Sequence, residues 1–234
     1  FSIDTGSIIR EMLSRGTGAV FFSATLSPLD YYRSVLGGDG TSDTLEVRSP
    51  FDPESLCVSI MDKISTRFSE REDTLGAVCR AIAATVSARR GNYMVFFPSY
   101  QYMTEMEAIF EEEPLEADLI VQGQGMGEAE RKEFLEEFER EREHSLVAFC
   151  VIGGVFSEGI DLKEERLIGV IIVGTGLPMV CVEQEILKGY FEETEERGFD
   201  FAYQYPGMNK VLQAAGRVIR THEDEGVILL LDDR

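Results

Sequence analysis

The feature that most constrains the fold of this chain is the alternation of short apolar runs with helix-length amphipathic stretches. Apolar runs rich in β-branched and aromatic residues predict strands near residues 18–24, 57–61, 93–97, 118–122, 146–152, 167–173 and 227–231. Helical patterns lie near residues 5–14, 28–36, 72–90, 100–112, 128–142, 180–197 and 208–219. This alternation predicts an α/β fold in which helices cover both faces of a mostly parallel sheet.

The charge of the chain restricts its contacts with nucleic acid. Lys and Arg number 22 against 43 Asp and Glu, a formal net charge of -21. The overall field therefore repels phosphate backbones, and any nucleic-acid contact must be local. No apolar run reaches the roughly 18 residues of a membrane helix, and no leader sequence opens the chain. We expect a cytoplasmic protein without a membrane partner, and a natural polypeptide longer than these 234 residues.

The cysteines give no sign of a metal centre. The four cysteines lie far apart, without a C-x-x-C pair, at positions Cys57, Cys79, Cys150 and Cys181. This spacing predicts buried free thiols in a reducing compartment, with no iron–sulfur cluster or other metal.

The segment with the most chemical information runs from Gln213 to Arg220 and reads QAAGRVIR. At about 100° per residue, a helix would place Gln213, Arg217 and Arg220 within roughly 60° of one another. Two aligned arginines in so acidic a chain suit a phosphate, because guanidinium groups bind its oxygens two at a time. The alternative is a surface helix whose arginines pair with neighbouring acidic helices, and spacing alone leaves both interpretations open.

A glycine-rich segment, GGVFSEGIDL at residues 153–162, follows the predicted strand 146–152. Open α/β sheets bind ligands at the carboxyl ends of parallel strands, where such a loop would lie. The glycines allow close approach of a partner, and Asp161 can accept hydrogen bonds from a sugar hydroxyl. A serine hydrolase is disfavoured, because Val155 stands where a nucleophile elbow needs glycine. Gly174–Pro178 resembles part of a dinucleotide motif, but a structural turn is favoured.

Two further segments have local explanations. Ser27 is predicted to cap a helix with Pro28 in its first turn, and Ser99 to cap the helix after strand 93–97. The sequence contains neither a G-x-x-x-x-G-K-[ST] phosphate loop nor a D-E-x-H-like segment for Mg²⁺. Any nucleotide chemistry must therefore be completed by residues outside this chain.

Taken in order, four segments resemble motifs III to VI of superfamily 2 helicases in the form of the XPD/DinG group. They are Ser23–Leu26, Val95–Tyr100, Gly154–Leu162 and Gln213–Arg220. The resemblance covers nearly the whole chain and implies a RecA-like three-layer sandwich, the second motor domain of an ATP-dependent DNA helicase. It implies that residues 1–36 contain motif III and a connection from the first motor domain, and that 37–234 form the C-terminal domain.

The same resemblance implies roles for individual residues. Arg217 and Arg220 would reach the γ-phosphate of ATP bound with Mg²⁺ mainly by the first motor domain, with Arg220 as the arginine finger and Gln213 coupling the interface. The nucleotide side of the cleft would be formed by Glu158, Gly159 and Asp161. The nucleic-acid track would be formed by Ser99, Tyr100 and Ser157. Coupling of hydrolysis to movement would involve Ser23 and Thr25.

The implied partners are single-stranded DNA or duplex junctions, and the first RecA-like domain of the same polypeptide. The implied role is in DNA repair, and the isolated chain is expected to be inactive. The main alternative is a non-catalytic RecA-like module that binds a nucleotide or a partner in the same pocket. A purely structural or interaction protein is a third class, but it leaves the Gln and Arg segment unexplained.

Overall fold

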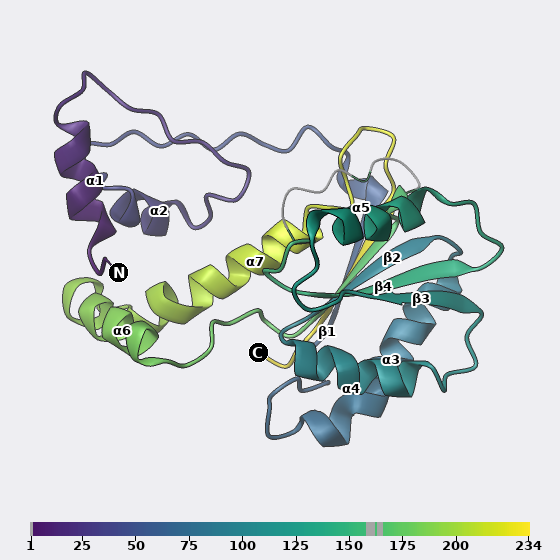
Figure 1. The fold of residues 1–234 in the computed structure, drawn as a ribbon. Helices are drawn as coiled ribbons and strands as arrows, with labels where there is room; N and C mark the ends of the chain where they lie inside the picture. The colour runs from purple at the N-terminus through teal and green to yellow at the C-terminus, as the bar shows by residue number, and fades with distance from the viewer. Residues whose placement is uncertain (1, 158–161, 163–165) are drawn as a thin grey trace. The chain divides into compact units, whose positions relative to one another are not determined.

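The computed structural model describes residues 2–157, 162 and 166–234 of the chain (Figure 1). The chain forms two compact units. The first comprises Phe1–Arg48 and Leu177–Asn209, and the second comprises Ser49–Gly176 and Lys210–Arg234. The predicted boundary after residue 36 separates residues of the first motor domain from those of the second, and it does not describe compact units. It therefore stays a prediction.

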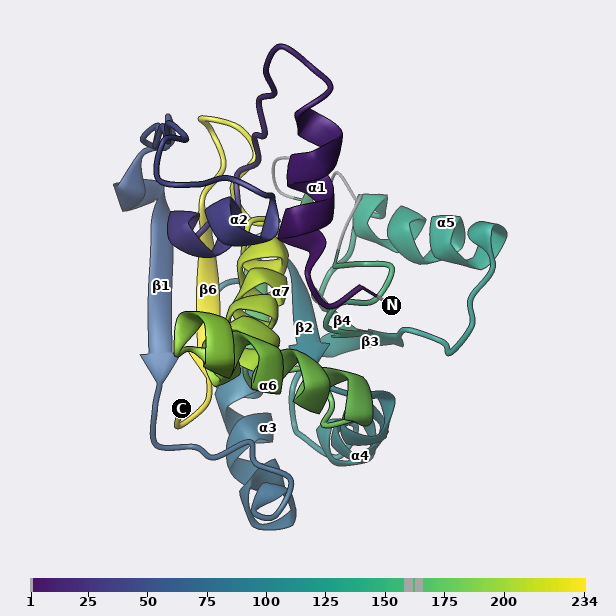
Figure 2. The same cartoon turned by 90° about the vertical axis from the view of Figure 1, so that its left-hand side faces the viewer.

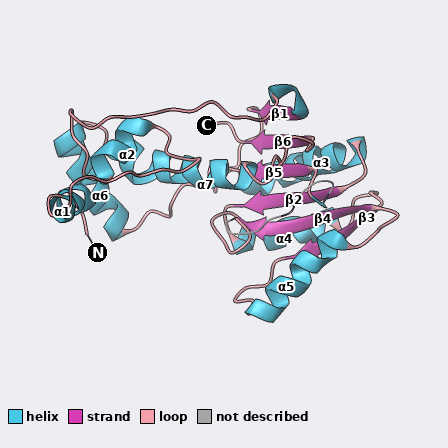
Figure 3. Ribbon diagram, turned by 90° about the horizontal axis from the view of Figure 1, so that it is seen from above, coloured by secondary structure: helices cyan, strands magenta, loops and turns pink. Residues whose placement is uncertain are grey.

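The second unit is built on a six-stranded sheet with the order β1-β6-β5-β2-β4-β3 (Figure 3). All of its neighbouring strands are parallel. The strands are β1 (Leu56–Met61), β2 (Asn92–Phe97), β3 (Ala117–Val121), β4 (Ser145–Val151), β5 (Gly169–Val173) and β6 (Gly226–Leu231). The predicted α/β class with a parallel central sheet is thus confirmed, and the central strands β2, β4 and β5 are buried almost throughout.

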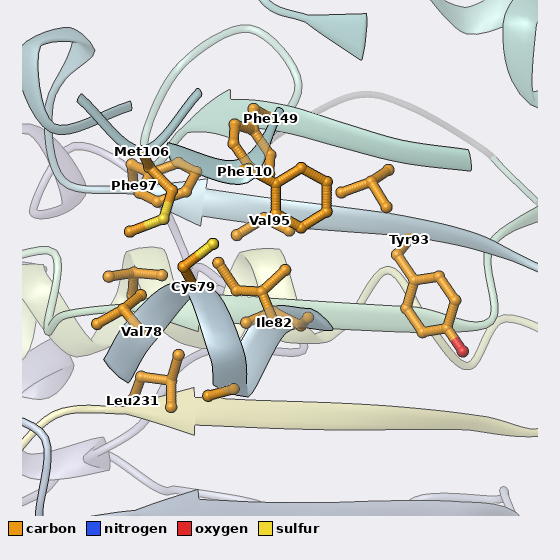
Figure 4. Close-up of a cluster of buried hydrophobic side chains, with 14 of the residues drawn as sticks. Val78, Cys79, Ile82, Tyr93, Val95, Phe97, Met106, Phe110, Phe149 and Leu231 are labelled. Carbon is orange, nitrogen blue, oxygen red and sulfur yellow. The ribbon is translucent and has the colours of Figure 1, made fainter. Parts of the chain in front are cut away.

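Helices cover both faces of this sheet, because successive strand side chains point to opposite sides. On one face, α3 (Arg71–Ala88) and α4 (Tyr100–Phe110) pack on a cluster that includes Val95, Phe97 and Phe149 (Figure 4). The other face is covered by α5 (Glu128–Glu136), by the 3-10 turn Glu137–Glu139, and by the last residues of α7 (Tyr205–Ala215). The three layers place the carboxyl ends of β2, β4 and β5 along one edge of the sheet.

The first unit is helical (Figure 2). It contains α1 (Thr5–Leu13), α2 (Leu29–Val35), α6 (Val182–Glu195), a π-helical turn (Asp200–Gln204) and the first residues of α7. Tyr31 contacts the rings of Phe201 and Tyr205, with ring centroids 5.0 and 5.1 Å apart. Ser34 donates a hydrogen bond to Glu195 at 2.9 Å, so α2 is held to the helices that follow residue 177.

Two predictions for the start of the chain are wrong. Residues 18–24 form no strand, and Val20 and Phe22 are 86% and 90% exposed. An apolar run becomes a strand only when another strand pairs with it, and none of the strands in the described ranges does so. Ser27 does not cap a helix, because Pro28 is the N-cap residue of α2 and makes no side-chain cap bond.

We expect the amides of residues 18–24 to exchange rapidly with solvent. Within the described residues, none of these amides donates a hydrogen bond to the backbone, and exposed amides without such bonds exchange at the low-stability end of the range. Hydrogen exchange followed by mass spectrometry, in a monomeric sample, measures this directly. Slow exchange across the segment would mean that it pairs within the monomer.

The four cysteines are free thiols, and the two in the sheet core and α3 are buried as predicted. Burial raises the pKa of Cys79 to about 11 and also raises that of Cys150. Cys57 differs from the prediction, because it lies exposed on the edge strand β1. No helix in the described part of the chain is long and apolar enough to cross a bilayer. Across the same ranges, no group of three or more His, Cys, Asp or Glu side chains is placed to hold a metal.

Candidate functional site

The glycine-rich loop after β4 is closed by its own hydrogen bonds. Ile152 donates its backbone N–H to the Phe97 carbonyl at 2.8 Å, which fixes the loop to the end of β2. The Ser157 hydroxyl accepts from the Gly153 N–H at 2.9 Å and donates to the Val151 carbonyl at 3.3 Å. Gly153 has a φ of +72°, a conformation that favours glycine. Residues 153–157, the first part of the loop, therefore have a defined backbone after the carboxyl end of β4.

The Ser157 side chain is used within the protein. Its side chain is fully buried at 0% exposure, and its hydroxyl is used inside the loop. It therefore shapes the segment from Val151 to Ser157, and the nucleic-acid contact predicted for it stays a prediction. The predicted nucleotide-side residues Glu158, Gly159 and Asp161 lie outside the described residues.

The helix that was predicted over 208–219 ends earlier, at Ala215. After α7 the hydrogen bonds change from the α-helical to the tighter 3-10 pattern, since Arg217 and Val218 donate their N–H groups to carbonyls three residues back. Gly216 is a poor helix former, and Val218 is drawn into the core against Gly226, where any side chain would collide with it. The single helical stripe predicted for Gln213, Arg217 and Arg220 is therefore wrong, because only Gln213 lies on α7.

Arg217 points into the protein and not along a surface. It is 8% exposed, and its Nη2 donates to the Ser157 carbonyl at 2.7 Å. This contact brings together two segments that the sequence singled out separately, the glycine-rich loop and the arginine segment. Sequence spacing could not predict it, because the two residues are 60 positions apart.

Arg220 begins a turn that is closed by a buried carboxylate. Asp224, 3% exposed, accepts from the backbone N–H groups of Arg220 at 2.6 Å and Thr221 at 2.7 Å. The Thr221 hydroxyl also donates to Asp224 at 2.9 Å. The backbone that carries the half-buried Arg220 side chain is therefore fixed, although it is not helical.

Ser99 and Tyr100 lie where β2 passes into α4. The Ser99 hydroxyl accepts from the Tyr102 N–H at 3.3 Å, which confirms Ser99 as the N-cap of α4. The Tyr100 hydroxyl accepts from the side chain of Gln122 at 2.8 Å. Gln122 was not singled out from the sequence, although a polar residue directly after the apolar run DLIV was a signal that could have found it.

A second polar cluster joins the carboxyl ends of β6 and β5 to the segment after β1. Asp232 accepts from Arg234 at 2.8 Å and from the Thr66 hydroxyl. Burial acts to raise the pKa of Asp232, but the bonds from Arg234 and Thr66 outweigh it and lower that pKa. Gly174, at a φ of +88°, lies against Thr66. The charged side chains of this cluster pair with one another, and the Gly174–Pro178 segment bends at Gly174 and continues as irregular backbone.

Ser23 and Thr25 belong to the first unit. Their hydroxyl groups lie 3.2 Å apart, and the Thr25 N–H donates to Ser23 at 3.2 Å. The pair thus forms a local turn, and the coupling role predicted for it stays a prediction.

The six-stranded parallel sheet with helices on both faces defines this chain as a RecA-like α/β domain. Its sequence from residue 82 to residue 234 matches the family model of the helicase C-terminal domain, and the chain belongs to that family. It is the C-terminal domain of a superfamily 2 helicase of the XPD/DinG type.

Similar proteins agree with this assignment. The ATP-dependent DNA helicase chl1 of Aspergillus fumigatus is 24% identical over 99% of this chain and 35% of its own length. The general transcription and DNA repair factor IIH helicase subunit XPD of Dictyostelium discoideum is 26% identical over 99% of this chain and 32% of its own length. A solved XPD helicase structure superposes with a TM-score of 0.77 at 19% identity, covering 100% of this chain and 42% of that one. This chain therefore spans about a third of its curated relatives.

Proposed function

We propose that this domain is the second motor domain of an ATP-dependent DNA helicase, and that Arg217 and Arg220 stabilise the transferring phosphoryl group. The observation that supports this most is the contact of Arg217 with the Ser157 carbonyl, because it fixes a buried cation against the glycine-rich segment that follows β4. Guanidinium groups so placed stabilise the charge that develops on a phosphoryl group during transfer.

The nucleotide in this proposal is ATP with Mg²⁺, which is held mainly by the first motor domain. The side chains of this chain fit a nucleotide that is shared between two domains in this way. The chain offers Arg217 and Arg220 for the γ-phosphate and Gln213 near the end of the preceding α7, and its sequence has no phosphate loop and no D-E-x-H-like segment of its own. Glu158, Gly159 and Asp161 are proposed to contact the nucleotide from the same loop. Ser23 and Thr25 are proposed to couple hydrolysis to movement.

The nucleic acid in this proposal is single-stranded DNA or the junction of a duplex. Ser99 and Tyr100 are proposed to contact it, since both lie at the carboxyl end of β2 and neither side chain is fully buried. The net charge of -21 requires that such contacts be few and sensitive to salt. A role in DNA repair belongs to the same proposal, because the Dictyostelium relative is named as a repair-factor subunit.

The test of the proposal combines this chain with a first motor domain that carries a phosphate loop. We expect DNA-stimulated ATP hydrolysis from the combined protein, measured by phosphate release with and without an oligonucleotide. A combined protein that binds nucleotide but never turns it over would instead fit a non-catalytic binding module.

The chain alone should hydrolyse no ATP above background. Phosphoryl transfer needs a loop that binds the phosphates and an acidic side chain that binds Mg²⁺. The sequence contains neither of the motifs that supply them. The measurement is phosphate release by the purified chain at millimolar ATP and Mg²⁺. Turnover that persists through repurification and a change of affinity tag would contradict the two-domain mechanism.

A further inference from the structure

Gln122 is one of the few polar side chains buried in the second unit. It is 3% exposed and directly follows β3, an edge strand of the sheet. Its backbone N–H donates to the Phe149 carbonyl at 2.9 Å, so the residue continues the pairing of β3 with β4. A polar side chain this deeply buried costs stability unless its hydrogen bonds are made.

The two ends of the Gln122 amide bind two different elements. Its Nε2 donates to the Tyr100 hydroxyl at 2.8 Å, at the start of α4. Its Oε1 accepts from the Val151 N–H at 2.9 Å, at the start of the glycine-rich loop. An uncharged amide offers both a donor and an acceptor, which is what these two partners require.

The bonds continue from Val151 to the arginine. The Val151 carbonyl accepts from the Ser157 hydroxyl at 3.3 Å, and the Ser157 carbonyl accepts from Arg217 at 2.7 Å. The loop also lies directly against the amide, since a Cβ added at Gly154 would stand 3.3 Å from Gln122 Nε2. A continuous path of contacts therefore leads from Tyr100 through Gln122 to Arg217.

We propose that Gln122 is a positioning residue that couples Tyr100 to the loop that holds Arg217. The inference rests on the proposed function, because it takes Tyr100 as a DNA contact and Arg217 as a phosphate contact. The Tyr100 hydroxyl accepts from Gln122 and keeps its own proton for a phosphate oxygen of the DNA. Displacement of Tyr100 by DNA is then transmitted to the Val151 backbone. A purely structural role, satisfying a buried amide, accounts for both bonds, so the role in coupling is decided by the dependence of DNA stimulation on this side chain.

The test is a double-mutant cycle in the native polypeptide that contains this domain. The measured quantity is the ratio of ATP turnover with a saturating oligothymidylate to turnover without DNA. Gln122→Met keeps the side-chain length and removes both hydrogen bonds, and it should lower this ratio at least about fivefold. In a Tyr100→Phe background, which has already lost the coupling, the same change should lower the ratio less than about twofold. Gln124→Met is the matched control, because Gln124 is exposed and two positions away.

Equal effects of Gln122→Met in the two backgrounds would overturn the coupling role, as would an unchanged ratio in the wild-type background. If the unsubstituted enzyme shows no DNA stimulation, the proposed function fails and this inference with it. A stimulated enzyme whose two changes simply add removes only the role of Gln122. Should Gln122→Met not fold, Gln122→Asn replaces it in the same cycle with the same expected result, since it keeps an amide but is one methylene too short to span both partners.

Discussion

Replacing Arg220 by alanine in the full helicase polypeptide should lower DNA-stimulated ATP hydrolysis at least about a hundredfold, because an arginine finger contributes on the order of a thousandfold or more to turnover. Nucleotide affinity should fall far less, since the guanidinium acts on charge that develops in the transition state. Steady-state ATPase kinetics and nucleotide binding, measured on the same preparation, separate the two effects.

Arg220→Lys is the informative companion variant. It keeps the positive charge but not the planar, two-pronged donor, and it should restore little of the lost activity. The turn is held by the backbone N–H of residue 220 on Asp224, which neither substitution removes. Near-normal ATPase in a folded Arg220→Ala enzyme would leave the motor assignment without its main chemical support.

Replacing Arg217 by alanine should damage both activity and stability. Activity should fall about a hundredfold if Arg217 contacts the same phosphoryl group. The domain should also lose about 1–3 kcal/mol of unfolding free energy, because the buried charge-assisted bond to Ser157 is removed. Urea unfolding of the isolated domain measures the second effect.

Lys132→Ala is the control for this stability measurement. Lys132 also forms an ion pair, with Glu136 at 3.5 Å, but its side chain is 78% exposed. Exposed pairs contribute little, so this variant should unfold like the original. A loss of stability in Lys132→Ala equal to that in Arg217→Ala would show that the Ser157 contact is unimportant.

The central strands β2, β4 and β5 could be predicted from sequence because each is buried on both faces. A nearly continuous apolar run such as NYMVFF at β2 is typical of a strand that is covered on both sides. The predicted and observed bounds of this strand differ by one residue. The apolar run at residues 18–24 has a similar composition but no strand beside it. Composition reports that a segment can be a strand, while pairing depends on what else is folded with it.

The candidate site was predictable in its parts but not in its connections. The Ser99 cap depends on neighbouring residues only, and it was predicted correctly. The end of α7 depends on the packing of Val218 against Gly226, and this tertiary contact overrode the helical periodicity. The bonds of Gln122 and Arg217 join residues 22 to 60 positions apart. No local pattern encodes such distances, so these residues required the folded arrangement.

The position of the last strand in the sheet has a consequence for synthesis. β6 is the last of the six strands in sequence, yet it lies between β1 and β5, inside the sheet. On the ribosome, β1 emerges early and must wait for residues 226–231 before its neighbour exists. Until then β1 and the inner strands cannot form one sheet, and the apolar edge of β5 is open to other chains. The domain should therefore reach its native sheet only after residues 226–231 have left the ribosome, and a shortened chain that lacks β6 should bind chaperones.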